Sequence, residues 1–549
     1  DLLNTTAGLV RTADGDATNF VGTRNSAVAT TREGIPVSDG RYRNWNGAFS
    51  ATYSSPDLVE EVQISVGTVD AAAGRGSSQV RLQTRSGTNE YHGALFWTTN
   101  NSVLNANNWF DNLLGNDKDW TNRNQYGGRL GGPIVRNKAF FFVLIDNQEY
   151  RTRENVTASV LTPQARQGIF RYFPGVQNDD VSGGAGASVD ELGNPRDWTQ
   201  ITGATGPLRT VNLFSDVRDP YRGTGISQNA YLQETLRRMP LPNNFRTGDG
   251  LNTAGFNWVR TVSGGDNAAG SSQNTNRKQL NVRLDYQITT NNKVNFVISR
   301  ESNDNDGLLP TWPSGIKGTQ FRKPRIYSTQ YTASITPNVL NEFRAGYRLT
   351  DWYTMAAVGE GCCLGNNEFV NLTPRAQELF DKYYSSSNGY PFLPSFPTMG
   401  AAFGSSPWFS AFGASRGQAS PLWTFQDNIR WVKGSHAFTA GWEGDWANTD
   451  GWTSGGLWPS ATLGNGAFPL DLQTRVPGIG LNAGLAEQVL NDLSGSVGSY
   501  GHTYVVNDPA RGFDTALEAA RSRLKYHQDD WAAFFKDDWN VTQNLTLNY

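Results

Sequence analysis

Hydrophobic and polar residues alternate along short runs of this chain. In the run that contains Leu280, Val282 and Leu284, the intervening residues are polar or charged. Because successive side chains of a β-strand point to opposite faces, such a run predicts a strand with one apolar and one polar face. A second run, with Val294 and Phe296, follows after a short turn. The two runs together predict an antiparallel hairpin.

The same unit recurs, and its connections fall into two length classes. Further hairpins are predicted over 126–150, 327–349 and 425–446, each closed by a few residues. The stretches between hairpins are long: 152–276, 301–323, 351–420 and 449–525. Outer-membrane β-barrels show this sorting, because one rim carries tight turns and the other carries long extracellular loops. We therefore predict an antiparallel membrane barrel whose outer faces contact lipid at Leu280, Val282, Leu284, Val294, Phe296, Ile298, Phe343, Tyr347, Phe438 and Trp442.

Composition is compatible with a barrel. The mean hydropathy is -0.51, which a barrel tolerates because only every second strand residue faces lipid. No segment approaches the roughly 20 apolar residues that a spanning helix needs. Of 17 tryptophans, several lie near predicted strand ends, where interfacial girdles would place them; sugar-binding platforms or ordinary core are the alternatives. The aromatic residues concerned are Trp97, Tyr126, Trp423, Trp431, Trp446 and Trp539.

Charge and motifs indicate neither an enzyme nor a nucleic-acid partner. Lys and Arg number 47 against 50 acidic residues, so no basic surface suggests nucleic acid. The sequence GASRG at 413–417 matches a nucleophile elbow, but it lies in a predicted loop and not between a strand and a helix. The four histidines lack metal-ligand spacing, and so do the adjacent Cys362 and Cys363, which form either a vicinal disulfide or an inert loop feature. We expect no catalytic residue, metal or cofactor.

Residues 1–89 break the alternating rhythm and predict a small α/β unit of their own. A wide barrel leaves a lumen that side chains cannot fill, so this unit is predicted to be a plug inside a barrel formed by residues 90–549. Buried charges need partners, and a plug against a wall supplies them. The contact is either one that lets the plug move or a set of static lumen charges. Its predicted residues are Arg81, Arg85, Arg129, Arg283, Asp285, Arg344, Arg348, Glu443 and Asp445.

Several motifs carry a family resemblance. They are GTR at 22–24, DLVEEV at 57–62, GRGSSQV at 74–80, TRSGTNEYHG at 84–93, NQYGG at 124–128, GGPI at 131–134, NKAFFF at 137–142, FFKDDW at 534–539 and LTLNY at 545–549. In combination they resemble the TonB-dependent outer-membrane receptors of the Oar-like subfamily. The resemblance implies a barrel of about 22 strands around a plug, of which about eleven are counted here. The family's TonB box and regulatory domain have no counterpart, so we expect a fragment with a shortened plug and an unpaired last run at 544–549.

The resemblance implies a receptor in the outer membrane of a Gram-negative bacterium. Such a protein binds a scarce solute at its extracellular loops and imports it through the plugged barrel, coupled to TonB through the missing N-terminal segment. Siderophore, cobalamin, oligosaccharide and peptide cargo all remain open. The alternative is a surface binding or adhesion protein that uses the barrel as an anchor in lipid. A secreted polysaccharide-binding protein would explain the tryptophans but not the sorted loops.

Overall fold

A computed structural model describes most of the chain. The described residues are 9–11, 18–20, 28–37, 52–66, 78–107, 109, 112, 118–265, 274–307, 309–315, 317–355, 359–360, 371–372, 416–453, 460–463, 471–501, 504–514 and 524–548. Cys362, Cys363 and most of the 413–417 motif lie outside these residues.

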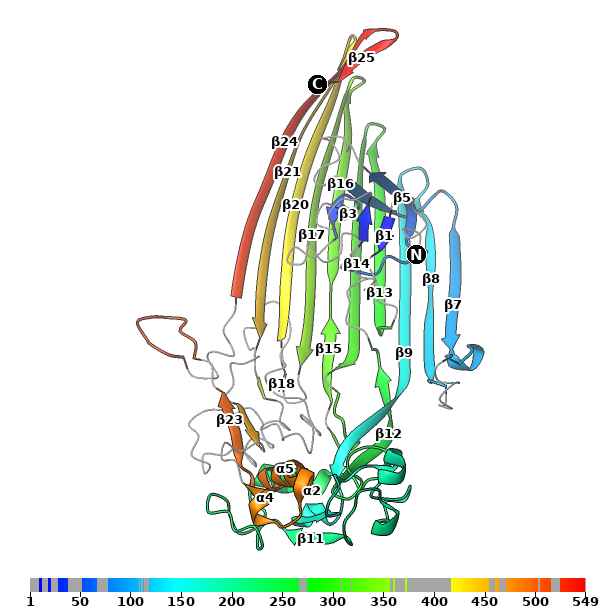
Figure 1. Ribbon diagram of the computed structural model, residues 1–549. Helices are drawn as coiled ribbons and strands as arrows, with labels where there is room; N and C mark the ends of the chain where they lie inside the picture. Colours follow the sequence, from blue (N-terminus) through cyan, green and yellow to red (C-terminus); the bar gives the residue numbers. More distant parts are fainter. Residues whose placement is uncertain are drawn as a thin grey trace.

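One antiparallel sheet of 13 strands forms a curved wall (Figure 1). The strands that run from rim to rim are β7 (His92–Asn101), β8 (Thr121–Val135), β9 (Ala139–Leu161), β13 (Arg277–Thr289), β14 (Asn292–Gly307), β16 (Arg325–Thr336), β17 (Val339–Met355), β20 (Arg416–Lys433), β21 (His436–Thr453) and β24 (Leu524–Thr542). β25 (Leu545–Asn548) is a short strand at the edge. Two further strands pair with the ends of long ones: β12 (Thr253–Ser263) with β9, and β15 (Gly318–Arg322) with β14 and β17. The predicted hairpins are all present.

The sheet is open in the described part of the chain. β7 pairs with β8, and β25 pairs with β24 at the opposite edge. Within β25, Leu547 lies opposite Trp539 of β24. The last run therefore lies at an edge and does not bond to β7, as expected from the strand count.

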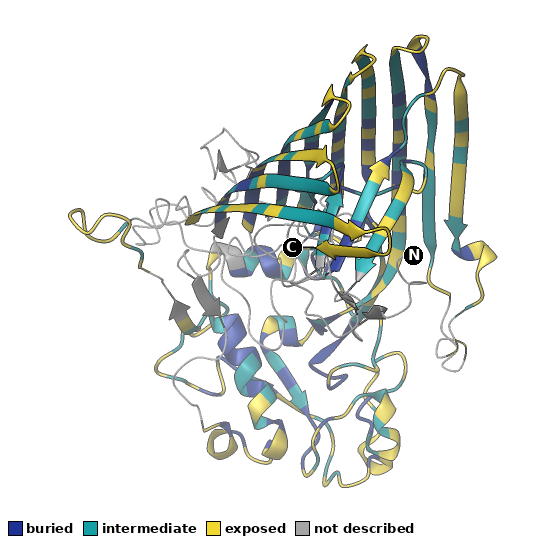
Figure 2. Ribbon diagram, turned by 90° about the horizontal axis from the view of Figure 1, so that it is seen from above, coloured by how far each residue is buried: buried dark blue, intermediate teal, exposed yellow. Residues whose placement is uncertain are grey.

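The two faces of the wall differ as the alternation predicts (Figure 2). On the convex face, Leu280, Leu284 and Phe296 are 40%, 42% and 45% exposed. Their inward neighbours Gln279 and Asn281 are 2% and 1% exposed. The other residues predicted to contact lipid occupy the same outward positions of β13, β14, β17 and β21.

Aromatic side chains gather at two levels of the outer face. On β20, Trp423 contacts Tyr347 with ring centroids 4.7 Å apart, and Trp431 contacts Phe438 at 5.4 Å. The two tryptophans are eight residues apart (431 − 423), which is about 26 Å of strand. Because strands of such barrels are tilted by about 35–45°, this length corresponds to about 20 Å across the membrane, which lies within the roughly 25 Å apolar band of an outer-membrane barrel.

A small sheet lies on the concave side of the wall, near its turn rim (Figure 1). Its strand order is β4 (Ile35–Pro36), β3 (Val28–Arg32), β6 (Ser78–Thr84) and β5 (Val59–Val66), with β3 and β6 parallel. A separate pair is formed by β1 (Leu9–Arg11) and β2 (Thr18–Phe20). We refer to the four-stranded sheet with residues 52–58 as the plug.

In the described residues, parts of the long connections form regular structure, which the sequence interpretation as loops did not predict. β9 continues to Leu161 and pairs with β12, well inside the stretch assigned to a loop. Beyond the rim lie β10 (Ile169–Tyr172), β11 (Arg209–Asn212), β18 (Gly359–Glu360), β19 (Asn371–Leu372), β22 (Ser460–Leu463), β23 (Val497–Gly501), α2 (Ala230–Arg238), α4 (Leu472–Arg475), α5 (Ala483–Ser494) and the 3-10 turns Ala165–Gln167, Val181–Gly186, Trp198–Gln200 and Gly480–Asn482; a further one, Ser102–Leu104, follows β7.

Residues 162–252, 309–315 and 471–495 pack together into one body at the loop end, which we call the cap (Figure 1). A core of Phe173, Val189, Ile201 and Leu251 lies within its first segment. These side chains are at most 3% exposed. The cap is therefore stabilised by apolar burial of its own, independent of the alternating pattern that builds the wall.

Candidate functional site between the plug and the wall

The plug touches the wall through residues 52–58, and Tyr53 is the centre of that contact. The Tyr53 backbone N–H donates to the Glu301 Oε2 of β14 at 2.7 Å, and the Gln279 side chain of β13 donates to the Tyr53 carbonyl at 2.6 Å. The Arg277 guanidinium lies 3.7 Å from the centroid of the Tyr53 ring and also donates to Asp146 Oδ1 at 3.2 Å. Two wall strands, β13 and β14, thus hold one plug residue by charged and polar groups.

Two residues of the same segment complete this first contact. Asp57 forms an ion pair with Arg129 of β8 at 3.0 Å. Leu58, which is 1% exposed, packs with Phe142 and Leu144 of β9. One apolar anchor therefore accompanies the polar contacts.

A second contact is made by the tip of the β3–β4 hairpin. Glu33 and Gly34 have φ angles of 53° and 79°, the left-handed pair that a two-residue hairpin turn of type I′ requires. For a residue with a side chain this conformation costs about 1–2 kcal/mol. Glu33 accepts hydrogen bonds from the Thr84 backbone N–H at 2.6 Å and the Thr84 hydroxyl at 2.7 Å. These bonds hold Glu33 in its strained conformation.

The hairpin tip meets β13 and β17 of the wall. Arg283 Nη1 lies 3.4 Å from Glu33 Oε1 and donates to the Thr84 carbonyl at 2.8 Å. On β17, Gly346 leaves the room that Ile35 fills, since a Cβ at Gly346 would lie 2.2 Å from Ile35 Cδ1. Both the charge pairing and the shape of this contact depend on the wall.

Arg32 lies behind the hairpin tip and is 1% exposed. Its guanidinium donates to the Thr52 hydroxyl. Burial lowers the pKa of Arg32 to about 10, against the opposing effect of the nearby Glu301 and Glu33 carboxylates. Arg32 therefore stays charged at neutral pH. The plug thus places the Arg32 cation near the Glu301 carboxylate of the wall, and the wall places the Arg283 cation near the Glu33 carboxylate of the plug.

Several residues predicted for this contact lie in it. Arg129 and Arg283 pair with plug carboxylates, as described above. Asp285 pairs with Arg283 on the same strand at 3.0 Å. Arg344 lies 3.8 Å from Glu342 and packs against the hairpin tip, where a Cβ at Gly34 would be 3.0 Å from Arg344 Cδ.

The other predicted residues are placed differently. Arg81 donates to Gln79 of its own strand at 3.2 Å. Among the described residues, no ion pair joins Arg85 to a wall carboxylate, and a pairing of Arg81 or Arg85 with the wall stays a prediction. Arg348 is fully buried on β17. On β21, Glu443 lies opposite Gln426 in the register, and Asp445 accepts a hydrogen bond from Thr424 at 2.7 Å.

The plug carboxylates that pair with wall arginines are Glu33 and Asp57, and the sequence interpretation missed both. Neither lies within an alternating run, so periodicity assigned them no face. Glu301 was missed because it was assigned to a long loop, whereas β14 runs to Gly307. The dipeptide Glu33-Gly34 was the available signal for a tight turn.

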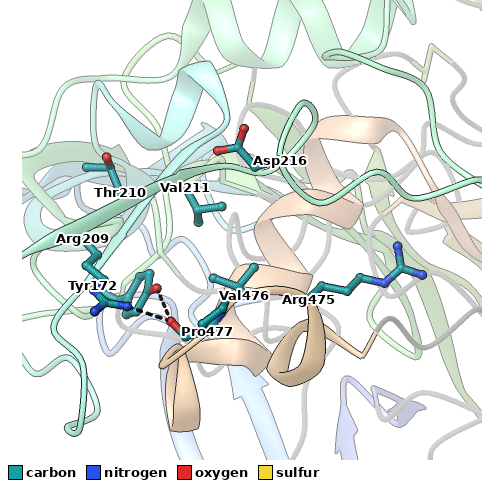
Figure 3. Close-up of a pocket in the computed structure, with 8 residues that line it drawn as sticks. All are labelled: Tyr172, Arg209, Thr210, Val211, Asp216, Arg475, Val476 and Pro477. Atoms are coloured by element: carbon teal, nitrogen blue, oxygen red, sulfur yellow. Dashed lines mark hydrogen bonds between the residues drawn. The ribbon is translucent and has the colours of Figure 1, made fainter.

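The cap carries a shallow cavity of about 340 Å³ (Figure 3). It lies where the first and last cap segments meet and is lined by Tyr172, Arg209, Thr210, Val211, Asp216, Arg475, Val476 and Pro477. The Tyr172 hydroxyl and Arg209 Nη1 both donate to the Pro477 carbonyl, at 3.0 and 3.2 Å. Hydrogen bonds from the Asn212 backbone N–H and the Ser215 hydroxyl lower the pKa of Asp216. The cavity thus has polar groups that are largely engaged within the protein.

No group of three or more metal-ligating side chains is present in the described part of the chain. In the same part, no helix has the length and apolar character needed to cross a membrane.

Comparison with known proteins identifies the class of the wall. A family model described as "Outer membrane beta barrel domain" matches residues 83–549. The chain therefore belongs to this family of barrels, and it resides in the outer membrane of a Gram-negative bacterium.

Solved structures resemble the chain at low identity. The outer membrane transporter YddB from Escherichia coli matches with 8% identity and a TM-score of 0.49, over 100% of this chain and 52% of that one. A ferric enterobactin receptor (PfeA) mutant from Pseudomonas aeruginosa matches with 13% identity and a TM-score of 0.44, over 100% and 53%. The siderophore receptor PirA from Acinetobacter baumannii matches with 10% identity and a TM-score of 0.40, over 96% and 48%. The chain spans about half the length of these proteins. No curated protein matches it significantly.

Proposed function

We propose that this chain is part of a TonB-dependent receptor of the Oar-like kind, which imports a scarce solute when its plug rearranges. In this proposal residues 1–89 are the plug and residues 90–549 belong to the barrel. The solute is a small molecule, an oligosaccharide or a peptide that first binds on the cap side. The energy-coupling protein would act through a segment of the receptor other than these residues.

The observation that carries the proposal is the chemistry of the plug–wall contact. Glu33, Tyr53 and Asp57 meet Arg283, Glu301 and Arg129 through ion pairs and hydrogen bonds. Charged groups separated in a dry interior would be costly, but water that enters a widening lumen can solvate each of them. Such a contact can open and re-form at lower cost than an apolar core of the same size.

Labelling of one buried plug residue tests the proposal. Ser55 is 1% exposed and lies within the anchored segment. The Ser55→Cys variant, with Cys362 and Cys363 replaced by serine, would be treated in whole cells with a membrane-impermeant maleimide. We expect labelling to rise severalfold in respiring cells on yeast-extract medium and to fall when a protonophore is added. Ser215→Cys, on the exposed surface of the cap, is the control that should label equally under both conditions.

The alternative, a surface binding protein that uses the barrel as an anchor, predicts a different result. The structured cap favours it, because a body with its own core can present a binding surface. In that case Ser55→Cys remains protected whether or not the cells are energised. Equal labelling under both conditions would contradict the transport proposal.

A further inference from the structure

The cap joins parts of the wall that are far apart. Its first segment connects β9 to β12, and its last segment connects β21 to β24. Five rim-to-rim strands, β13, β14, β16, β17 and β20, lie between β9 and β21 in the sheet. Six strand spacings of about 4.8 Å separate these strands by about 29 Å along the arc. A loop between adjacent strands does not by itself constrain distant ones.

The seam between the first and last segments consists of direct bonds between them. The Asn482 side chain accepts a hydrogen bond from the Asn178 backbone N–H at 2.8 Å and donates to the Val176 carbonyl at 2.9 Å. The Ser227 N–H donates to the Leu493 carbonyl at 2.9 Å. Asn482 is 3% exposed, so these bonds are sheltered from water.

Arginines extend the seam on both sides. Arg475 Nη1 donates to the carbonyls of Val217 and Arg218, each at 3.0 Å. Arg222, in a buried ion pair with Asp219, donates to the side chain of Asn491 on α5. The two segments therefore bond along much of their shared surface.

The β14–β15 connection, from the middle of the arc, is bonded to the same body. Arg238 Nη1 of the first segment donates to the Ser314 carbonyl at 2.8 Å, and the Ser314 hydroxyl donates to the Arg238 carbonyl at 3.2 Å. The connection is also bonded to the wall, because Trp258 Nε1 of β12 donates to the Thr311 carbonyl at 2.8 Å. Trp312, between Thr311 and Ser314, is 0% exposed. Three places along the loop rim are thus held at fixed separations by one packed body.

The turn rim is built differently. The predicted tight turns, such as the one at Gly434 (φ 60°) between β20 and β21, join only neighbouring strands. Hydrogen bonding between strands fixes their spacing but leaves the curvature of a sheet to twist and packing. The cap spans the arc at the loop rim, and it therefore adds the constraint on curvature that the tight turns lack.

We propose that the cap is a brace, which sets the curvature of the wall and thereby assists assembly of the barrel in the outer membrane. This role is separate from solute import and does not rest on it. It requires only that the first and last segments stay bonded to each other. The hydrogen bonds between the two segments, which we call the tie, should then determine the fraction of the protein that assembles into a barrel more than the folding of either segment does.

Paired variants separate the tie from the fold of one segment. Asn482→Leu removes two buried seam bonds, and it removes no helix cap because the Asn482 side chain makes no capping bond to α5. Its buried control is Asn178→Leu, since the Asn178 side chain bonds only within the first segment, to Arg171, Phe173 and Asp249. Arg475→Met removes seam bonds at the exposed side. Its exposed control is Asn243→Leu, which removes one accepted and one donated bond to Asn257 of β12 and no bond to the last segment.

The readout is the fraction of the full-length protein that shows heat-modifiable mobility in outer-membrane extracts, which measures folded barrel and involves no solute. We expect Asn482→Leu to lower this fraction by a factor of about 5 or more relative to its control, because Asn482→Leu removes bonds between the two segments and the control removes only bonds within one. Arg475→Met should lower it less, in the same direction. Assembly of both seam variants at the level of their controls, whether high or low, would overturn the proposal. The exposed pair decides the question if neither buried variant is produced.

Discussion

The plug–wall contact lies on the concave side of the sheet and the seam of the cap lies at its loop end, and the two are built from different groups (Figure 1). At the wall, carboxylates and arginines from opposite sides face each other, with one apolar anchor at Leu58. In the cap, the α5 side chains of Val489, Leu490 and Leu493 are at most 1% exposed. Many seam acceptors there are backbone carbonyls such as that of Pro477.

The difference indicates which contact can open. Ion pairs and hydrogen bonds exchange for water at a modest net cost, whereas exposing buried apolar side chains costs about 25 cal/mol per Å². The plug is held mainly by the exchangeable kind of interaction. In the cap, hydrogen bonds across the seam are accompanied by buried apolar side chains within the segments, which suits a body that stays assembled.

The largest effect is expected in the cap core. Leu490→Ala removes a side chain that is 1% exposed and should destabilise the cap by about 2–5 kcal/mol, through lost burial and the cavity left behind. Protease cleavage within 471–501 on whole cells measures this loss. Leu481→Ala, in the same segment but 73% exposed, should change stability by less than about 0.5 kcal/mol. A cap that stays resistant after Leu490→Ala would contradict a stabilising role for the buried face of α5.

The wall between the two contacts supplies the next test. Val282 lies on the outward face of β13, and Val282→Arg should cost roughly 2–4 kcal/mol near the middle of the bilayer and less toward an interface. Urea unfolding of the barrel in lipid measures it. Lys278→Arg, outward on the same strand and already charged, is the matched control. Equal stability of the two variants would argue against lipid at Val282.

A smaller effect is expected at the hairpin tip. Arg283→Met removes the bonds to the Thr84 carbonyl and to Glu33, and leaving the buried Glu33 carboxylate without its cation should cost about 1–3 kcal/mol. The loss should appear as faster proteolysis of residues 28–89, with the barrel intact.

A double variant sharpens this prediction. Adding Glu33→Gln to Arg283→Met should recover part of the loss, since no unpaired charge then remains in the contact. If the two single losses simply add, Glu33 and Arg283 do not interact, and the proposed charge pairing is wrong.

The smallest effect concerns acid and the cap. Hydrogen bonds from Arg237, and then from Arg238, lower the pKa of Glu234 from 4.5 to about 2, against the opposing effect of burial. Because the pKa is lower in the folded state, the stabilisation is complete above pH 4.5 and declines as pH falls toward 2. Hydrogen exchange of α2 measured from pH 6 down to 3 should accelerate beyond the intrinsic trend. Glu234→Gln should remove that excess, and an unchanged excess would contradict the assignment to Glu234.

The membrane wall could be predicted from the sequence because lipid on one side and a polar lumen on the other impose a period of two on every strand. The hairpin from Leu280 to Ile298 and the outward position of Val282 follow from that period alone. Even the open edge at β25 followed from counting alternating runs. The ends of β9 and β12 could not be predicted in this way, since residues 151–161 and 253–263 pair with each other away from lipid.

Only the tertiary structure decided what covers the concave side. Wall arginines such as Arg129 and Arg283 could be placed on the inner face by periodicity, but their partners Asp57 and Glu33 come from segments of short strands and turns. The cap depends in the same way on contacts between residues some 300 positions apart, such as Asn178 and Asn482. The alternation of residues shows which face of a strand meets lipid and which meets a polar environment. It does not show which distant segment of the chain packs against the polar face.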